Sequence, residues 1–199
     1  MIKEQLKHWK RGRIFFLEDV SDVNTYQATR KQLSRLSKTG TIISYGNGIY
    51  SYPVIDKDFG LGAIKATNED IAEKYAKHKG IQLFLTPAAA QNQLGLSTQN
   101  QLNAIYYTDG QSRKLNTKRG NGIVLIHTSN NNLKRFKAQK MQWLAIALDV
   151  SYKRELTDTE KTIIARHIKS IPEVDYGHDL KLMKLWQQKL LMKCGKRIS

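Results

Sequence analysis

The sequence predicts an α+β fold in which helices and short strands follow one another along the chain. Apolar residues recur at helical spacing in several segments, and short β-branched or aromatic runs bounded by glycine predict strands. Hydrophobic residues make up 40% of the chain, which is enough for a folded core. A length of 199 residues suits one large or two small domains, and we expect a boundary between residues 1–55 and 56–199.

The first part of the chain predicts two helices separated by a strand. Residues 2–10 predict a helix, because their apolar side chains fall on one side. Residues 13–16 (RIFF) predict a short strand, and residues 17–23 predict a small second helix and a turn.

The next segment predicts a longer helix that runs directly into a β-hairpin. Asn24 or Thr25 is expected to cap the helix, and Gly40 lies just past its end, where a left-handed residue is common. Gly46-Asn47-Gly48 predicts the tight turn of the hairpin, because these residues tolerate positive φ. Pro53 ends the strand pairing, since it has no N–H to donate. The inner side of the helix is expected to consist of Thr29, Leu33 and Leu36.

The opposite side of this helix carries no acidic residue. A solvated helix face usually mixes charges of both signs, whereas cations and amides without acids suit a polyanion. Arg and Lys neutralise phosphates, and Arg or Gln can also make bidentate contacts to bases in a major groove. A helix that lacks acids by chance is the alternative. The face consists of Tyr26, Gln27, Arg30, Lys31, Ser34 and Arg35.

This order of helices and strands is that of a winged helix-turn-helix, in which the helix after the turn enters the major groove of DNA. We therefore predict a DNA-binding domain over residues 1–55, with a small α+β domain without such a role as the alternative. The cations would contact phosphates or guanines, the residues at the helix start would lie near base edges, and the wing tip would approach the neighbouring backbone or minor groove. The predicted contacts are Thr25, Tyr26, Gln27, Arg30, Lys31, Ser34, Arg35 and Asn47.

The net charge of +16 predicts an acidic partner, either nucleic acid or, less expected, an anionic membrane surface. Residues 1–55 hold nine basic and four acidic residues, residues 56–152 thirteen and seven, and residues 153–199 eleven and six. Because the excess is spread along the chain, the second domain is also a candidate for phosphate contacts, with a solvated surface as the alternative. The basic clusters that we single out there contain Lys118, Arg119, Lys134 and Arg135.

Residues 56–199 predict a mixed α/β domain whose last third is helical, after a linker around residues 52–62. Asp109-Gly110 predicts a tight turn that pairs residues 103–108 with residues 112–116. Thr157 and Glu160 predict a capping box. The expected helices cover residues 67–80, 86–95, 136–148, 157–172 and 179–193, and the expected strands cover residues 81–85, 103–108, 112–116 and 122–127.

The last expected helix, residues 179–193, places Leu182, Trp186 and Leu190 on one side. This stripe is expected to be core, and a self-association surface is the alternative. A homodimer is therefore an open option, which also suits the paired half-sites that many DNA-binding proteins recognise.

The sequence contains no catalytic or metal-binding motif that we recognise. The five histidines lack metal-ligand spacing, and there is no nucleophile elbow or phosphate loop. Asp109 lies near Arg113 and Lys114, but its Asp-Gly context favours a turn residue. We expect no catalytic residue, no metal and no cofactor. A nuclease-like enzyme delivered by the winged helix and a protein-interaction module remain as alternative functions.

The single cysteine, Cys194, excludes an intramolecular disulfide and a multi-cysteine zinc site, and suits a reducing cytoplasm. The first ten residues lack the apolar region of a secretory signal. The longest apolar run, residues 143–148, is far shorter than the ~20 residues of a membrane span. We therefore expect a cytoplasmic protein that does not enter a membrane.

The stretch TRKQLSRLSKTGTIISYGNGIYSYP resembles the N-terminal winged helix of AbiEi-type antitoxins, which are transcriptional regulators of bacterial type IV toxin–antitoxin systems. The similarity continues through residues 86–90 (TPAAA), 94–99 (LGLSTQ) and 106–110 (YYTDG), so it covers residues 1–130 and leaves the helical last third unmatched. It implies a repressor that binds inverted repeats in double-stranded DNA upstream of its own operon. It also implies that the second domain counters a nucleotidyltransferase toxin without needing a stable complex, although a stand-alone regulator would have no such toxin.

Overall fold

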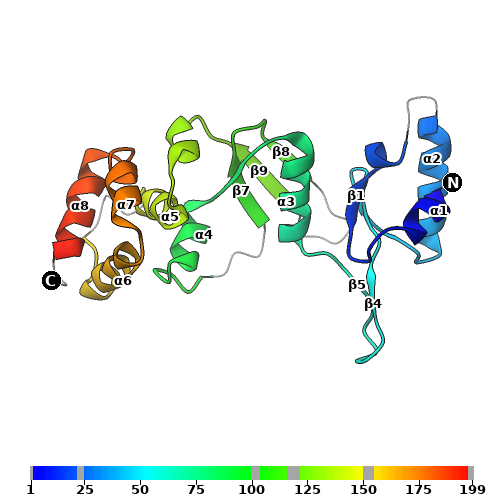
Figure 1. Ribbon diagram of the computed structural model, residues 1–199, viewed down its shortest axis with the longest axis horizontal. Coiled ribbons are helices and arrows are strands. Elements are labelled where there is room, and N and C mark those ends of the chain that lie inside the picture. Colours follow the sequence, from blue (N-terminus) through cyan, green and yellow to red (C-terminus); the bar gives the residue numbers. More distant parts are fainter. Residues whose placement is uncertain (1, 22–24, 100–103, 116–121, 150–154, 197–199) are drawn as a thin grey trace. The chain divides into compact units, whose positions relative to one another are not determined.

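The computed structural model has an α+β fold, as predicted, and describes residues 2–21, 25–99, 104–115, 122–149 and 155–196 (Figure 1). The chain divides into two compact units. The first comprises Met1–Ile81 and Arg113–Val124, and the second comprises Gln82–Ser112 and Leu125–Ser199. The first unit therefore extends beyond the boundary expected after residue 55.

The first unit holds a three-stranded antiparallel sheet with the strand order β1-β3-β2. Its long helix, α2, precedes the hairpin formed by β2 and β3, as the sequence predicts. The elements are α1 (Ile2–Lys7), β1 (Ile14–Phe16), the 3-10 turn η1 (Leu17–Asp19), α2 (Tyr26–Lys38), β2 (Ile43–Gly46), β3 (Ile49–Ser51), β4 (Val54–Asp56), β5 (Gly62–Ile64) and α3 (Asn68–Lys79).

Both faces of this sheet are covered, because successive side chains of a strand point to opposite sides. Phe15 lies opposite Tyr50 in the register, the two rings stack with centroids 5.7 Å apart, and Phe15 belongs to the core formed with α1 and α2. Phe16 points the other way, where its ring lies 3.9 Å from the ring of His78 and 6.4 Å from that of Tyr75 on α3. The packing of α3 against Phe16 explains why the first unit reaches Ile81.

Two local expectations in the first unit need correction. The first helix, expected to reach residue 10, ends at Lys7, and Trp9 packs against the core from outside the helix. The second helix, expected over residues 17–23, is the three-residue turn η1, in which Asp19 accepts a hydrogen bond from the N–H of Phe16 and Ser21 donates one to the carbonyl of Leu17. These local side-chain bonds satisfy the backbone without a longer helix. Asn24, one of the two expected caps of α2, lies outside the described residues.

The segment expected to be a linker, residues 52–62, contributes to a β-hairpin, because β4 pairs with β5 in antiparallel register. The carboxylate of Asp56 accepts hydrogen bonds from the N–H groups of Asp58, Phe59 and Leu61 in the turn. Chiefly through the bond from Leu61, these contacts hold the pKa of Asp56 below its usual range. The side chain of Asp56 thus organises a turn in a segment whose composition alone suggests a spacer.

A capping box begins helix α3, within the helix expected over residues 67–80. Thr67 Oγ1 accepts a hydrogen bond from the N–H of Asp70, and Asp70 in turn accepts one from the N–H of Thr67. The helix ends at Gly80, whose φ of 65° is left-handed, as expected for a C-terminal glycine.

The second unit is mainly helical, and a four-stranded sheet with the order β6-β7-β9-β8 precedes its helical part. Helix α5 begins later than the residue 136 expected, because a 3-10 turn and a bend come before it. The remaining elements of the chain are β6 (Leu83–Leu85), α4 (Pro87–Gln93), β7 (Ala104–Thr108), β8 (Arg113–Leu115), β9 (Ile123–His127), the 3-10 helix η3 (Asn131–Arg135), α5 (Gln139–Leu148), α6 (Asp158–Lys169), α7 (Glu173–Leu180) and α8 (Leu185–Lys196). Of these, β8 and the first two residues of β9 belong to the first unit.

The strand order corrects the predicted hairpin around Asp109. Strand β7 pairs with β6 and neighbours β9, so it does not pair with β8 across the Asp109-Gly110 turn. The carboxylate of Asp109 instead accepts a hydrogen bond of 2.7 Å from the N–H of Gln82 and forms an ion pair of 2.7 Å with Lys134. Contacts to residues far away in the chain therefore replace the local turn.

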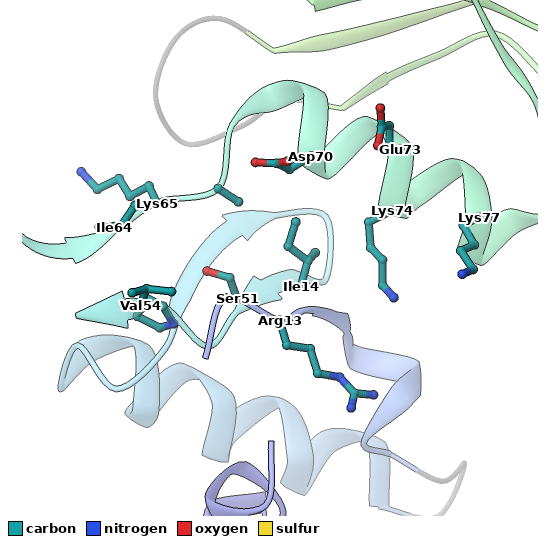
Figure 2. A pocket seen from close by; sticks show the side chains of 13 residues that line it. Arg13, Ile14, Ser51, Val54, Ile64, Lys65, Asp70, Glu73, Lys74 and Lys77 are labelled. Carbon is teal, nitrogen blue, oxygen red and sulfur yellow. The ribbon is translucent and has the colours of Figure 1, made fainter. Parts of the chain in front are cut away.

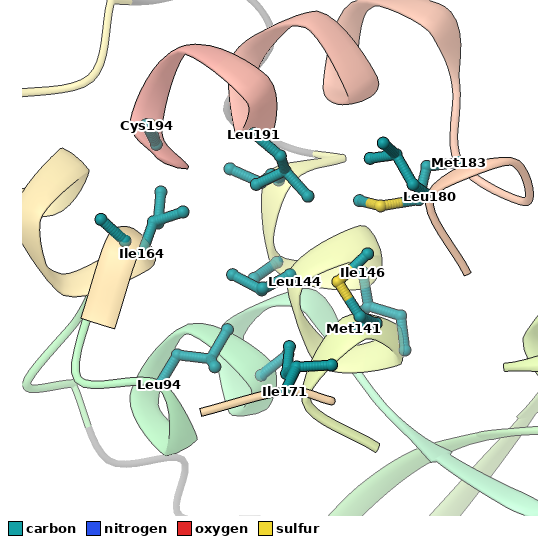
Figure 3. Packing of buried hydrophobic residues seen from close by; sticks show 14 of the residues in the cluster. Leu94, Met141, Leu144, Ile146, Ile164, Ile171, Leu180, Met183, Leu191 and Cys194 are labelled. Atoms are coloured by element: carbon teal, nitrogen blue, oxygen red, sulfur yellow. The ribbon is translucent and has the colours of Figure 1, made fainter. Parts of the chain in front are cut away.

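The core of the second unit lies between its helices (Figure 3). Met141 and Leu144 of α5 are fully buried, together with Ile164 of α6 and Leu191 of α8. The last helix, expected over residues 179–193, is in fact interrupted between α7 and α8. The predicted stripe is consequently displaced by one residue: Leu182, Trp186 and Leu190 are half-buried, and the buried positions are Met183, Gln187 and Leu191.

Asp179 lies in the last turn of α7, just before the interruption. Its side chain is completely buried at the end of α7 and accepts hydrogen bonds from the N–H groups of Lys137 and Ala138, immediately before α5. A new helix then starts where the Gln187 side chain accepts a bond from the N–H of Lys184. The buried Asp179 carboxylate thus ties the last turn of α7 to the start of α5.

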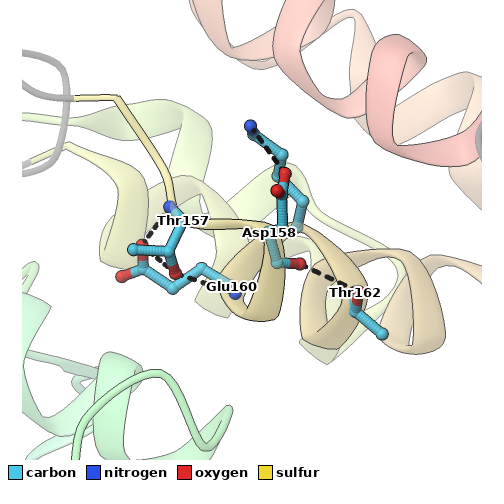
Figure 4. Close-up of polar contacts among 5 residues, drawn as sticks. Thr157, Asp158, Glu160 and Thr162 are labelled. Atoms are coloured by element: carbon cyan, nitrogen blue, oxygen red, sulfur yellow. Dashed lines mark hydrogen bonds and ion pairs between the residues drawn. The ribbon is translucent and has the colours of Figure 1, made fainter.

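Helix α6 has the predicted capping box (Figure 4). Thr157 Oγ1 accepts a hydrogen bond of 3.2 Å from the N–H of Glu160, and Glu160 accepts one of 2.8 Å from the N–H of Thr157. Asp158 and Lys161 add an ion pair of 3.2 Å. The helix ends at Lys169, and Pro172 precedes α7 rather than closing α6.

Candidate nucleic-acid interface

The packing of α2 determines which of its side chains face solvent. Leu33 and Leu36 are buried in the core with α1 and β1, and Thr29 is buried on the same side. The opposite face is therefore turned outward. All eight side chains predicted to contact DNA are exposed: Thr25, Tyr26, Gln27, Arg30, Lys31, Ser34, Arg35 and Asn47.

The exposed face of α2 carries cations from Arg30 to Lys38. Lys38 in the last turn joins Arg30, Lys31 and Arg35, and no acid occurs between residues 26 and 38. An acidic side chain in the first turn would interact favourably with the helix dipole, yet α2 has none there. Lys38 was not among the predicted contacts, although its spacing from Arg35 places it on the adjoining turn.

Tyr50 of β3 is half-buried against the core to which α2 contributes Leu33 and Leu36. Burial raises the pKa of the Tyr50 hydroxyl, the positive charge of Arg30 opposes that rise, and Tyr26 adds to it. Both α2 side chains therefore act on the same hydroxyl group. Sequence reasoning placed Tyr50 in a strand and gave it no part in the site, because its proximity to α2 depends on how the hairpin folds back.

The hairpin tip is built from three residues with positive φ: Gly46 at 89°, Asn47 at 51° and Gly48 at 73°. The N–H of Leu17 donates a hydrogen bond of 2.9 Å to the carbonyl of Gly48, which ties the tip to η1. On β2, the Tyr45 hydroxyl lies 3.0 Å from that of Ser51. The tip thus has a defined position beside η1, with the Asn47 side chain exposed.

The other basic clusters differ from the α2 face in their partners. Lys134 pairs with Asp109, and Arg135 donates a hydrogen bond of 3.2 Å to Asn132. Lys118 and Arg119 lie outside the described residues. Phosphate contacts at these four residues stay a prediction.

The sequence left Asp109 open as a catalytic carboxylate. In the structure its carboxylate instead joins two segments, through Gln82 and Lys134. Burial by itself would raise its pKa, but the hydrogen bonds from Lys134 and from the N–H of Gln82 outweigh burial and hold the pKa below its usual range. The guanidinium of Arg113 donates to the Tyr75 hydroxyl at 2.8 Å. Across the described residues, no group of three or more His, Cys, Asp or Glu side chains is placed to hold a metal ion.

The chain belongs to the family DUF6088, which is described as a family of unknown function and whose model matches residues 1–174. No curated protein and no solved structure matches the chain. Within the described part of the chain, none of the helices combines the length and the apolar character that crossing a membrane requires.

Proposed function

We propose that this protein is a sequence-specific DNA-binding repressor whose residues 1–55 act as a winged helix-turn-helix. The observation that carries the proposal is the exposed face of α2, which holds four cations and no acid and is followed directly by a hairpin with a positive-φ tip. The strand order β1-β3-β2 supports the same interpretation, because it sets the hairpin beside the strand that precedes η1.

In this proposal α2 is the recognition helix. Arg30, Lys31 and Arg35 contact phosphates or guanines, because guanidinium and ammonium groups match both. Thr25, Tyr26 and Gln27 lie in the first turn, where base edges are reached, and Ser34 shares the face. Asn47 approaches the neighbouring backbone or minor groove from the hairpin tip.

The biological setting of the proposal comes from the resemblance to AbiEi-type antitoxins. We propose a cytoplasmic regulator that binds inverted repeats in double-stranded DNA upstream of its own operon, with two copies on the two half-sites. The second unit would counteract a nucleotidyltransferase toxin without a necessary stable complex. A nucleotidyltransferase gene directly beside this gene, and growth rescue by the full chain in cells that express that enzyme, would support the antitoxin role.

Binding of labelled DNA from upstream of its own gene tests the DNA-binding role, with unlabelled unrelated DNA as competitor. We expect specific binding, and we expect Arg30→Ala combined with Lys31→Ala to weaken it about 30-fold, since each lost contact costs about 1 kcal/mol. Lys189→Ala combined with Lys193→Ala, which removes the same charge from exposed positions on α8, is the matched control.

Two results of this experiment would count against the proposal. If no upstream fragment binds in preference to unrelated DNA, the protein is not the repressor that we propose. If specific binding survives the double substitution in α2, or falls equally in the α8 control, α2 is not the recognition helix.

A further inference from the structure

Exposed apolar side chains gather on the β4–β5 hairpin. Among the described residues, ten large hydrophobic side chains are exposed, and five of them lie within residues 54–64. Phe59 and Leu61 in the turn are 86% and 74% exposed, and Val54, Ile55 and Ile64 are the other three. Single exposed apolar residues are normal on a protein surface, but a cluster of this kind is typical of a surface that binds another molecule.

The base of the hairpin is attached to the first unit, whereas its tip projects from it. Val54 and Ile64 lie opposite each other in the register and line a groove beside the three-stranded sheet (Figure 2). Figure 1 shows the hairpin extending away from that sheet. Because hydrogen bonds to the Asp56 carboxylate organise the turn, Phe59 and Leu61 are held in solvent on a defined structure.

Both outer edges of the hairpin are without a neighbouring strand among the described residues, because β4 and β5 form a two-stranded sheet by themselves. A two-stranded hairpin is at best marginally stable in water, and its free N–H and C=O groups can pair with a strand of another chain. Proteins often protect such edges with lysine or proline, and neither residue occurs in β4 or β5. A partner that supplies a strand would therefore complete this small sheet.

The charge of the hairpin indicates what kind of partner fits. Residues 52–66 contain two acids and two bases, so they are neutral in a chain whose net charge is +16. Two copies of the chain repel each other through their net charge, and contact between neutral segments brings the least repulsion. The carboxylates of Asp56 and Asp58 at the turn disfavour the phosphates of DNA or of an anionic membrane as the partner.

The charges are also arranged so that the hairpin is complementary to itself. The turn carries Asp56, Lys57 and Asp58, with a net charge of −1, and Lys65 follows the base of the hairpin. Two hairpins that lie side by side in opposite directions place the turn of each beside the base of the other. Opposite charges then meet at both ends, and the apolar side chains of each turn lie near the apolar base of its neighbour.

We propose that the β4–β5 hairpin is a contact between two copies of this chain, with the two hairpins antiparallel about a two-fold axis. The same surface serves both partners in such a dimer, and burial of the apolar side chains stabilises it. Residues 54–65 are fewer than the roughly 20–30 residues per partner of a standard interface, so we expect a Kd on the order of 10 µM. The stripe that the sequence offered for self-association, Leu182, Trp186 and Leu190, is instead half-buried in the second unit. The proposal does not depend on DNA recognition by α2.

Sedimentation velocity of the full chain without DNA tests the contact, over protein concentrations from about 1 to about 200 µM. The site variant is Phe59→Ser with Leu61→Ser. The control is Val174→Ser with Leu185→Ser, which removes two apolar side chains of similar exposure, 78% and 75%, from the second unit. Thermal unfolding confirms that both variants fold.

We expect a monomer–dimer equilibrium in which the site variant loses at least about tenfold in affinity and the control less than about threefold. A monomer at every concentration, or equal losses in the two variants, would overturn the proposal. If the unmodified chain stays monomeric and the site variant loses binding to anionic vesicles or to unrelated DNA, the hairpin binds lipid or nucleic acid instead. Arg30→Ala with Lys31→Ala should leave dimerisation unchanged, so the dimer contact and DNA recognition can fail independently.

Exchange of charges tests the antiparallel alignment. We expect Asp58→Lys alone and Lys65→Asp alone each to weaken dimerisation about fivefold, because each places like charges together at both ends of the contact. An equal mixture of the two variants should regain the affinity, since opposite charges then face each other again. If the mixture associates no better than either variant alone, the hairpins are not aligned as we propose.

Discussion

Helices α2 and α6 have nearly the same length, 13 and 12 residues, but they are stabilised in different ways. Helix α6 has a capping box, two acids in its first turn, cations in its last turn and an internal ion pair. Helix α2 has no acid in its first turn, and Thr25, the described residue before it, makes no side-chain cap bond to that turn.

This contrast shows where each helix obtains its stability. Local devices contribute a few tenths to about 1 kcal/mol each, and α6 collects several of them. Helix α2 depends instead on burying Leu33 and Leu36, and tertiary packing of this kind is the larger source of helix stability. Its exposed face carries no acid, a property that suits binding to a polyanion.

Reversing one charge on each helix is the test of this contrast with the largest expected effect. We expect Lys31→Glu on α2 to weaken binding to upstream DNA about 100-fold, because it removes a phosphate contact and introduces repulsion. Arg166→Glu on α6, at another exposed cation, should change the affinity less than about threefold if α6 does not contact DNA. Fluorescence anisotropy at one fixed salt concentration measures both variants. Equal losses would mean that overall charge, and not the α2 face, determines binding.

Ala28→Glu sharpens the comparison, because it gives α2 an acid in the first turn like those of α6. We expect the free energy of unfolding to rise by about 0.5 kcal/mol through the helix dipole. DNA affinity should fall about tenfold, since the new carboxylate lies on the exposed face. Denaturant unfolding and a DNA-binding titration measure the two effects, and Ala28→Gln is the uncharged control. A variant that is stabilised and binds DNA normally would contradict our explanation for the missing acid.

Thr157→Ala tests the local stabilisation of α6. The substitution removes the side-chain oxygen that accepts the N–H of Glu160, and we expect it to lower the free energy of unfolding by about 1 kcal/mol. Thr162→Ala is the matched control, because Thr162 donates to a carbonyl within the same helix and caps nothing. We expect the control to be close to neutral, since Ala favours helix more than Thr. If urea unfolding gives similar losses in the free energy of unfolding for Thr157→Ala and Thr162→Ala, the cap does not stabilise α6.

Lys161→Ala tests the smallest expected contribution to the stability of α6, which is the ion pair with Asp158. Because the side chain of Asp158 is 86% exposed, water and salt screen the pair, and we expect a loss below about 0.5 kcal/mol. The loss should shrink further as salt is added. Thermal unfolding at low and high salt measures it. A loss that persists at high salt would show that the stem of Lys161 contributes by packing rather than by charge.

Expectations that rest on neighbouring residues agree best with the structure. The capping box at Thr157 and the helix end at Gly80 each depend on a few neighbouring residues, so their signals are complete within a short window. The α2 helix and the hairpin after it were predicted for the same reason. The inward stripe of α2 was also correct, because an amphipathic helix has one apolar side to bury.

Expectations that required a choice between distant partners often failed. Asp109-Gly110 has a strong turn signal, but the carboxylate binds Gln82 and Lys134, and β7 pairs with β6. Asp179 reads as the start of a helix, but it lies in the last turn of α7, where its buried carboxylate accepts hydrogen bonds from the N–H groups before α5. The linker around Asp56 became a hairpin because one carboxylate organises its turn. The burial of Tyr50 against the core was missed, since its neighbours come from other elements.

The sequence by itself determined that the fold is α+β, that α2 has a buried side and an acid-free side, and that a positive-φ turn follows it. These properties depend on residue type and on the period of the helix. The tertiary structure alone decided which strands pair, where the last helix is interrupted, and that α3 covers the second face of the sheet. Pairing and burial depend on contacts between residues far apart in the chain, and no local pattern specifies which of several compatible partners will meet.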